Sequence, residues 1–163
     1  PVISTYSEFG CVPCRAAPAT IATTLDELAD SGTATVIYRP IAILGPGSTR
    51  AAAAAGCAQD DGRFRAYHDA LFDHQEEAAQ AGGFTTQMLV ELGRSVGLDG
   101  PEFVRCVEDQ IYERWVEDAT LEASKRGVHA TPTVYVNGRQ LALVPGDPNA
   151  AAQLRDAIGQ PAG

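Results

Sequence analysis

The stretch Val2-Ile3-Ser4-Thr5-Tyr6-Ser7-Glu8-Phe9-Gly10-Cys11-Val12-Pro13-Cys14 opens the chain and decides its fold class. Its first six residues are β-branched, small or aromatic, which is typical of a β-strand, and Gly10 then marks a tight turn. From Cys11 to Asp30 the sequence is rich in alanine, with larger apolar residues at helical spacing, and Ser31-Gly32 supplies a stop. This part of the chain therefore predicts a strand, a turn and a long helix that begins at a pair of cysteines.

The residues after this helix predict a second strand at 34–38 and a loop at 40–47. A strand, a helix and a strand in this order form a unit in which the strands run parallel and the crossover is right-handed. The N-terminal third of the chain is therefore expected to supply half of an α/β sheet.

The middle of the chain shows only helical patterns, and strand character returns near the C-terminus. Helices are expected at 51–60, 64–74, 85–96 and 100–124. Two strands at 133–136 and 140–144 flank Asn137-Gly138, a dipeptide typical of hairpin turns, and a last helix is expected at 149–158.

The length of 163 residues suits one well-buried core and is short for two. We therefore expect a single α/β domain over residues 1–163. Residues of about 1–47 and 126–163 are expected to form the part that contains the sheet, and residues of about 48–125 an all-helical insertion.

Charge and hydropathy exclude some classes of partner. The net charge is -9, and the 12 lysines and arginines are spread along the chain with only Lys125 and Arg126 adjacent, so no basic surface is expected for nucleic acid or an anionic membrane. No apolar run approaches the roughly 20 residues that span a bilayer. The chain opens at Pro1 without the charged and apolar regions of a signal peptide, so we expect that any addressing or anchoring segment was removed or lies upstream.

The motif Cys11-Val12-Pro13-Cys14 fits two kinds of site, because CxxC occurs both as half of a zinc site and as a redox-active pair. A zinc site needs four ligands, but there is no second CxxC, and the three histidines, at positions 68, 74 and 129, lie 54 or more residues beyond Cys14. A helix start favours the redox pair, because unpaired backbone N–H groups stabilise a thiolate there. We predict Cys11 as the nucleophile, Cys14 as the resolving thiol one turn further along, and no metal.

A redox pair also needs a backbone platform beside its sulfurs, and Thr131-Pro132-Thr133 is the candidate. It stands immediately before the strand at 133–136, a position that a proline can occupy. Taken alone, this proline is more simply interpreted as an ordinary trans residue that begins a strand.

Together, these segments resemble the DsbA-like thioredoxin-fold proteins of bacterial envelopes. The similarity lies in the element order around Cys11 and Cys14 and in Gly127 to Gly138, with agreement in Ser7 to Cys11 and Gly62 to Phe72. It covers essentially the whole chain and is closest to the Gram-positive, actinobacterial and DsbG-like branch, in which threonine precedes a cis-proline. The resemblance implies a thioredoxin fold (βαβ…ββα) with an all-helical insertion.

The resemblance also implies site roles and an activity. Pro132 would be cis, and Thr131 would contact the active-site sulfur and bound peptide backbone. The implied activity is thiol-disulfide exchange, most simply an oxidase that introduces disulfides into exported proteins.

Two features of the sequence around the cysteines modify the expected oxidase activity. Val12-Pro13 lacks the histidine that is common between the family's cysteines, so we expect a milder oxidant. Glu8 stands where many relatives of this branch have an acidic residue and could shuttle protons, although a solvated loop glutamate fits the sequence equally well.

The remaining cysteines, Cys57 and Cys106, lie in the expected helical insertion. They could be two buried thiols, because cysteine is often fully buried. An even number of cysteines in a protein that handles disulfides outside the cytosol favours a structural bridge, and the pairing Cys57–Cys106 follows only if Cys11 and Cys14 pair with each other.

The expected partners follow from the same resemblance. They are unfolded or reduced exported proteins and a membrane reoxidase. We expect the protein to be a monomer in an extracytoplasmic compartment. We expect no cofactor besides the Cys11–Cys14 disulfide. The alternatives are a disulfide reductase or isomerase, and a peptide-binding holdase with structural cysteines. A glutathione-dependent isomerase or transferase is weaker, because those relatives usually lack the paired cysteines.

Overall fold

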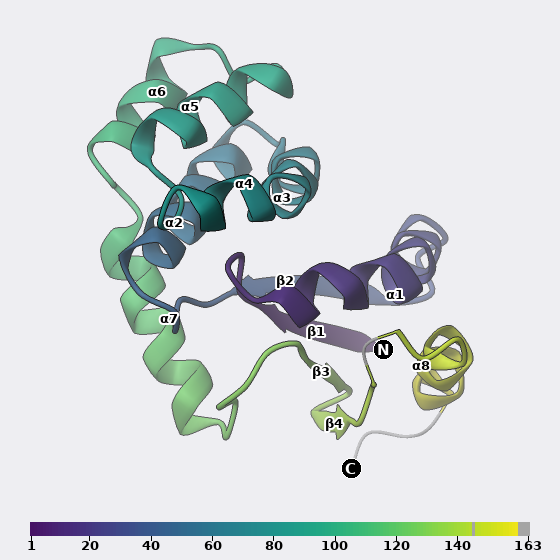
Figure 1. Ribbon diagram of the computed structural model, residues 1–163. Helices are drawn as coiled ribbons and strands as arrows, with labels where there is room; N and C mark the ends of the chain where they lie inside the picture. The colour runs from purple at the N-terminus through teal and green to yellow at the C-terminus, as the bar shows by residue number, and fades with distance from the viewer. Residues whose placement is uncertain (145, 160–163) are drawn as a thin grey trace. The chain divides into compact units, whose positions relative to one another are not determined.

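A computed structural model describes residues 1–144 and 146–159, apart from the side chains of 16–20 (Figure 1). In chain order the elements are β1 (Val2–Ser7), α1 (Val12–Asp30), β2 (Thr35–Pro40), α2 (Pro46–Asp60), α3 (Phe64–Asp73), α4 (Gln75–Gln80), α5 (Thr86–Ser95), α6 (Pro101–Glu108), α7 (Glu113–Lys125), β3 (Thr133–Val136), β4 (Arg139–Leu141) and α8 (Ala150–Ile158). The expected α/β class with a helical insertion is confirmed.

The chain divides into two compact units. The sheet unit contains Pro1–Ser7, Cys11–Arg39 and the described residues from Val128 onward, and the helical unit contains Glu8–Gly10 and Pro40–Gly127. The helical unit thus begins before position 48, where the sequence placed the insertion, and it takes in three residues that directly precede Cys11. That both units form a single domain stays a prediction.

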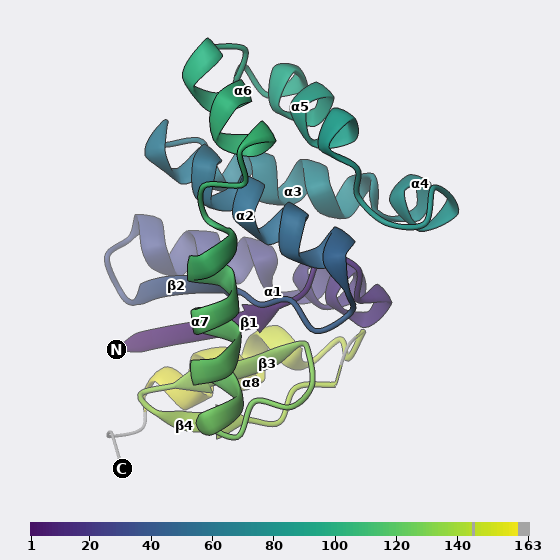
Figure 2. The same cartoon turned by 90° about the vertical axis from the view of Figure 1, so that its left-hand side faces the viewer.

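The sheet unit has the strand order β2-β1-β3-β4 (Figure 2). β1 and β3 are antiparallel, with Tyr6 opposite Thr133 and Ile3 opposite Val136. β3 turns into β4 through Asn137-Gly138, whose φ angles of 50° and 82° are those that a tight hairpin turn needs. The pairing brings the start of β3 beside the end of β1, which leads toward Cys11.

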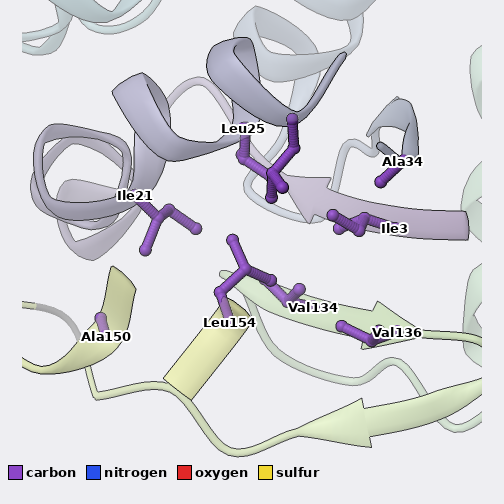
Figure 3. Packing of buried hydrophobic residues seen from close by; sticks show 9 residues of the cluster. Ile3, Ile21, Leu25, Ala34, Val134, Val136, Ala150 and Leu154 are labelled. Atoms are coloured by element: carbon purple, nitrogen blue, oxygen red, sulfur yellow. The ribbon is translucent and has the colours of Figure 1, made fainter. Parts of the chain in front are cut away.

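One apolar core holds the sheet unit together (Figure 3). Alternate residues of a strand face the same side, so Val134 and Val136 point together, and α1 and α8 cover that side. The buried members are Ile3, Ile21, Leu25, Leu28, Ala34, Val134, Val136, Ala150 and Leu154. This packing fixes α1 against the sheet, and therefore fixes the start of α1.

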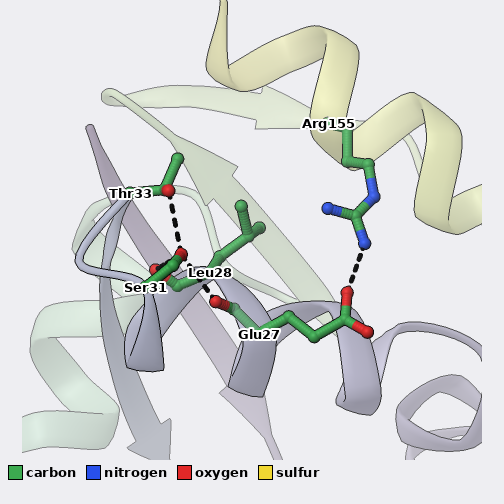
Figure 4. A network of polar contacts seen from close by, with 5 residues as sticks. All are labelled: Glu27, Leu28, Ser31, Thr33 and Arg155. Carbon is green, nitrogen blue, oxygen red and sulfur yellow. Dashed lines mark hydrogen bonds and ion pairs between the residues drawn. The ribbon is translucent and has the colours of Figure 1, made fainter.

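Polar contacts at the other end of α1 tie it to α8 (Figure 4). The Ser31 hydroxyl donates to the Glu27 carbonyl at 2.7 Å and lies 2.9 Å from the Thr33 hydroxyl, while Arg155 pairs with Glu27 at 2.5 Å. The ion pair is half-exposed and so contributes little to stability, whereas the Ser31 contacts satisfy carbonyls at the helix end.

The helical unit is built around α2, which contacts α3, α5, α6 and α7. Its five consecutive alanines, 51–55, are all buried, and their small side chains let neighbouring helices approach closely. The buried Tyr67 hydroxyl donates to the Leu89 carbonyl at 2.8 Å and joins α3 to α5. In the described part of the chain, no helix is long and apolar enough to cross a membrane.

The expected helix at 100–124 is wrong as a single element. α6 ends at Glu108 and α7 begins at Glu113, because Gln110 adopts a left-handed φ of 50°. Beyond the break, the Tyr112 ring lies against Gly56, where a Cβ atom would meet it at 2.8 Å. This packing is a tertiary contact that helical periodicity does not reveal.

Other boundaries also differ from the expectation. α2 begins at Pro46, within the expected loop, since proline suits the first turn of a helix. α4 was not expected at all. β4 ends at Leu141 rather than 144, because the Leu143 amide turns back to the Leu141 carbonyl at 3.0 Å.

Candidate active site

Cys11 is the residue that caps the N-terminus of α1. Its φ of -79° and ψ of 112° are extended, and the helix begins at Val12. Pro13 lies in the first turn, where the N–H that it lacks would have no partner within the helix. The Cys14 amide donates to the Cys11 carbonyl at 3.0 Å, so the backbone places both sulfurs at the start of the helix.

The two sulfurs differ in access. The Sγ atoms of Cys11 and Cys14 are 2.6 Å apart. Cys11 is 8% exposed and Cys14 0%, while the neighbouring Val12 is 72% exposed. Of the two cysteines only Cys11 keeps any exposed surface, so an incoming sulfur would meet Cys11 first, which is the order of events that a nucleophile and a resolving thiol require.

The loop before β3 supplies a polar backbone atom beside Cys11. The Cys11 thiol lies 3.3 Å from the Thr131 carbonyl oxygen, and the Thr131–Pro132 peptide bond is cis. The Thr133 hydroxyl donates to the Ala130 carbonyl at 2.8 Å and closes the loop on itself. The fold thus brings Thr131, and Pro132 bonded to it, to a cysteine 120 positions away in the sequence.

Glu8 is fully buried and belongs to the helical unit. The interpretation of Glu8 as a solvated loop residue is therefore wrong. Its Oε1 accepts the Gly10 amide at 3.1 Å. Burial raises the pKa of this carboxyl, and the Ser48 hydroxyl and the Gly10 amide offset that rise only in part.

The second pair of cysteines forms a disulfide. Cys57 of α2 and Cys106 of α6 are joined, with a Cα–Cα distance of 5.9 Å. Cys57 is buried, and the bridge links two helices that also pack on each other. Among the described residues, no three His, Cys, Asp or Glu side chains gather as they would around a metal ion.

Two residues that hold the segment preceding Cys11 were missed by sequence reasoning. Phe9 is fully buried, and its carbonyl accepts the side-chain amide of Gln75 at 2.8 Å. Gln75 is itself buried. The apolar residue before Gly10 is a weak signal for Phe9, but Gln75 lies 66 positions away and only the fold reveals it.

The family model Thioredoxin_4, described as thioredoxin, matches residues 1–160. A reduced form of the disulfide bond oxidoreductase DsbG from Mycobacterium tuberculosis is 33% identical, with a TM-score of 0.79 over 98% of this chain and 78% of that one. The chain is a member of the DsbA-like thioredoxin family.

The oxidised DsbA from the same organism is 34% identical to this DsbA-like chain, with a TM-score of 0.79 over 98% of this chain and 83% of that one. BdbD from Bacillus subtilis, at 21% identity, shares the fold with a TM-score of 0.80 over 96% of this chain and 84% of that one. No protein with a curated description matches. The expected resemblance and the thioredoxin fold are confirmed, and the protein is a thiol-disulfide oxidoreductase of the DsbA type.

Proposed function

We propose that this DsbA-like oxidoreductase is an oxidase that introduces disulfides into exported proteins. The observation that carries the proposal is the unequal access of the two cysteines at the start of α1, since Cys11 keeps 8% of its surface exposed and Cys14 keeps none. A pair arranged in this way forms the mixed disulfide at Cys11 and keeps Cys14 out of reach of other thiols.

The reaction proceeds by two exchanges. A substrate thiolate attacks Sγ of Cys11 in the Cys11–Cys14 disulfide, which forms a mixed disulfide and releases Cys14 as a thiolate. A second substrate thiolate then attacks the substrate sulfur of the mixed disulfide and releases Cys11 as a thiolate. The substrate loses two electrons and the cysteine pair gains them, so the pair itself carries the electrons and no cofactor is invoked.

The site supports specific roles for its other residues. The positive end of the α1 helix dipole favours the Cys11 thiolate that each turnover releases. An extended substrate backbone is proposed to lie along Thr131-Pro132 by strand-like pairing, which recognises main chain rather than sequence. Glu8 is proposed to hold and release a proton during exchange, because burial favours its neutral form.

An oxidising, extracytoplasmic compartment is part of the proposal. The Cys57–Cys106 disulfide supports it, since structural disulfides persist outside the reducing cytosol. In such a compartment the substrates are reduced exported proteins, and a membrane reoxidase returns the pair to its disulfide form. We propose that the protein meets both as a monomer.

A redox titration tests the direction of the reaction. The protein is equilibrated with glutathione buffers, the thiols are alkylated, and the fraction of the Cys11–Cys14 disulfide is measured by mass. We expect a potential at or above about -180 mV, on the oxidising side of the glutathione pool, whereas a value near the -270 mV or so of thioredoxin would show a reductase.

A trapping experiment tests the order of events. Cys14→Ser should leave a dithiol peptide attached to Cys11 as a mixed disulfide, while Cys11→Ser should trap nothing. Full activity of Cys11→Ser in the oxidation of a reduced protein would instead support a holdase with structural cysteines.

A further inference from the structure

Three consecutive residues, Glu8, Phe9 and Gly10, precede the nucleophile and belong to the helical unit. The next residue, Cys11, belongs to the sheet unit. The peptide bond between Gly10 and Cys11 is therefore a direct covalent link from a helical-unit segment to the sulfur that reacts.

This segment is held at Phe9 by α3 and α4. The Gln75 side-chain amide, 4% exposed, donates to the Phe9 carbonyl at 2.8 Å. The Phe9 ring packs against His68 and Phe72, with ring centroids 5.6 Å and 5.1 Å away. A buried carbonyl that loses its donor cannot recover the bond from water, so this contact constrains the backbone strongly.

The residues on either side of Phe9 are fixed as well. The Gly10 amide donates to Glu8 Oε1 at 3.1 Å. A Cβ atom at Gly10 would lie 3.3 Å from Glu8 Oε2 and 3.4 Å from the Ser48 hydroxyl, so the backbone passes close to both groups. Side chains of the helical unit thus fix the path of the chain up to the residue before Cys11.

We infer that Gln75 is a positioning residue for the redox reaction: through the Phe9 carbonyl it holds the backbone that enters Cys11. This inference rests on the proposed role of Cys11 as the nucleophile. A thiolate at a helix start is stabilised only while the sulfur stays at the positive end of the helix dipole, whereas a disulfide is held by its own covalent bond. Loosening the segment should therefore weaken the thiolate form more than the disulfide form.

The test compares Gln75→Leu with Tyr67→Phe. Each removes one buried side-chain donor to a carbonyl at 2.8 Å in the helical unit, but only Gln75 bonds to the segment before Cys11. The full chain is used, at a temperature where each variant is folded by circular dichroism. Iodoacetamide alkylation of Cys11 is followed by mass at about pH 6 and about pH 9, and the glutathione equilibrium is measured in parallel.

We expect Gln75→Leu to slow alkylation several-fold at the lower pH with little change at the higher, and to move the glutathione equilibrium several-fold toward the disulfide. Tyr67→Phe should change neither quantity. Phe9→Leu, which removes the ring contacts but keeps the carbonyl, should shift both in the same direction as Gln75→Leu, and it serves if Gln75→Leu does not fold.

Two results would overturn the inference, and they are distinguishable. If the Gln75 and Phe9 variants leave the alkylation ratio and the equilibrium unchanged, or if Tyr67→Phe shifts them equally, Gln75 has only a structural role. If Cys11 of the unaltered protein reacts no faster than Cys14, the proposed function fails, and the positioning role fails with it.

Discussion

The two pairs of cysteines in this chain place the same chemical group in opposite circumstances. Cys11 and Cys14 are three residues apart, stand at the start of α1, and are 8% and 0% exposed. Cys57 and Cys106 are 49 residues apart and form a disulfide between two packed helices. A disulfide between Cys11 and Cys14 closes a very short loop and can be broken by thiol exchange. The Cys57–Cys106 disulfide closes a long loop and stabilises the fold. Loop length and access to the sulfurs therefore distinguish the redox pair from the structural pair.

The largest effect is expected at Cys11. Cys11→Ser should lower the rate of disulfide exchange by on the order of a thousand-fold or more, because it removes the nucleophile itself. The measurement is the oxidation of a reduced dithiol peptide by the oxidised protein. A variant that keeps a tenth or so of the activity would show that Cys11 does not carry the reaction.

The second pair should affect stability and not exchange. Replacing Cys57 and Cys106 together by alanine opens a loop with a sequence separation of 49, and we expect a loss of about 4 kcal/mol in the free energy of unfolding. Urea denaturation measures it. The glutathione equilibrium of Cys11–Cys14 should stay within about twofold, and a larger shift would mean that the two pairs are coupled.

Beside the first pair, Glu8→Gln should change how stability depends on pH. Burial raises the pKa of Glu8 above its ordinary value of 4.5, so the folded protein binds this proton more tightly than the unfolded chain. The contribution of the neutral carboxyl is fully present below 4.5 and is lost as the pH rises through the folded-state pKa. Glu8→Gln should remove this loss of unfolding free energy with rising pH.

Urea denaturation at several pH values from about 4 to about 8 measures the difference between the two curves. Glu122→Gln is the control, because the adjacent Lys125 lowers the pKa of this exposed carboxyl, and any effect should have the opposite sign. Parallel curves for the unaltered protein and Glu8→Gln would contradict the raised pKa.

The smallest effect on stability is expected at Tyr112, in the same unit as the Cys57–Cys106 disulfide. Its hydroxyl donates to both carboxylate oxygens of Asp60, at 2.7 Å and 2.9 Å, and the bond raises the pKa of Tyr112. The pair is exposed, so Tyr112→Phe should cost at most about 1 kcal/mol of unfolding free energy and leave exchange unchanged. Asp60→Asn keeps one acceptor oxygen for the Tyr112 hydroxyl and should therefore cost less unfolding free energy than Tyr112→Phe. If Asp60→Asn costs more, the hydrogen bond is not the contribution that Tyr112 makes to stability.

Much of the fold follows from local sequence. β1, α1 and the hairpin turn at Asn137-Gly138 lie where periodicity and turn chemistry place them, because each depends on neighbours within a few residues. The break between α6 and α7 does not, since Gln110 carries no signal of a left-handed backbone and the Tyr112 ring packs on a residue from α2. Likewise, α4 carries the Gln75 amide to a carbonyl 66 positions away.

The sequence by itself determined the chemistry of this protein: a CxxC pair after a strand and at the start of a helix, with Thr131-Pro132 before a later strand. Only the tertiary structure decided which sulfur is accessible, that the Thr131 carbonyl lies 3.3 Å from Cys11, and that Glu8 is buried rather than solvated. The physical reason is that residue type and spacing fix bonding capacity and local backbone. Burial and contacts across 120 residues arise only when strands pair and helices pack.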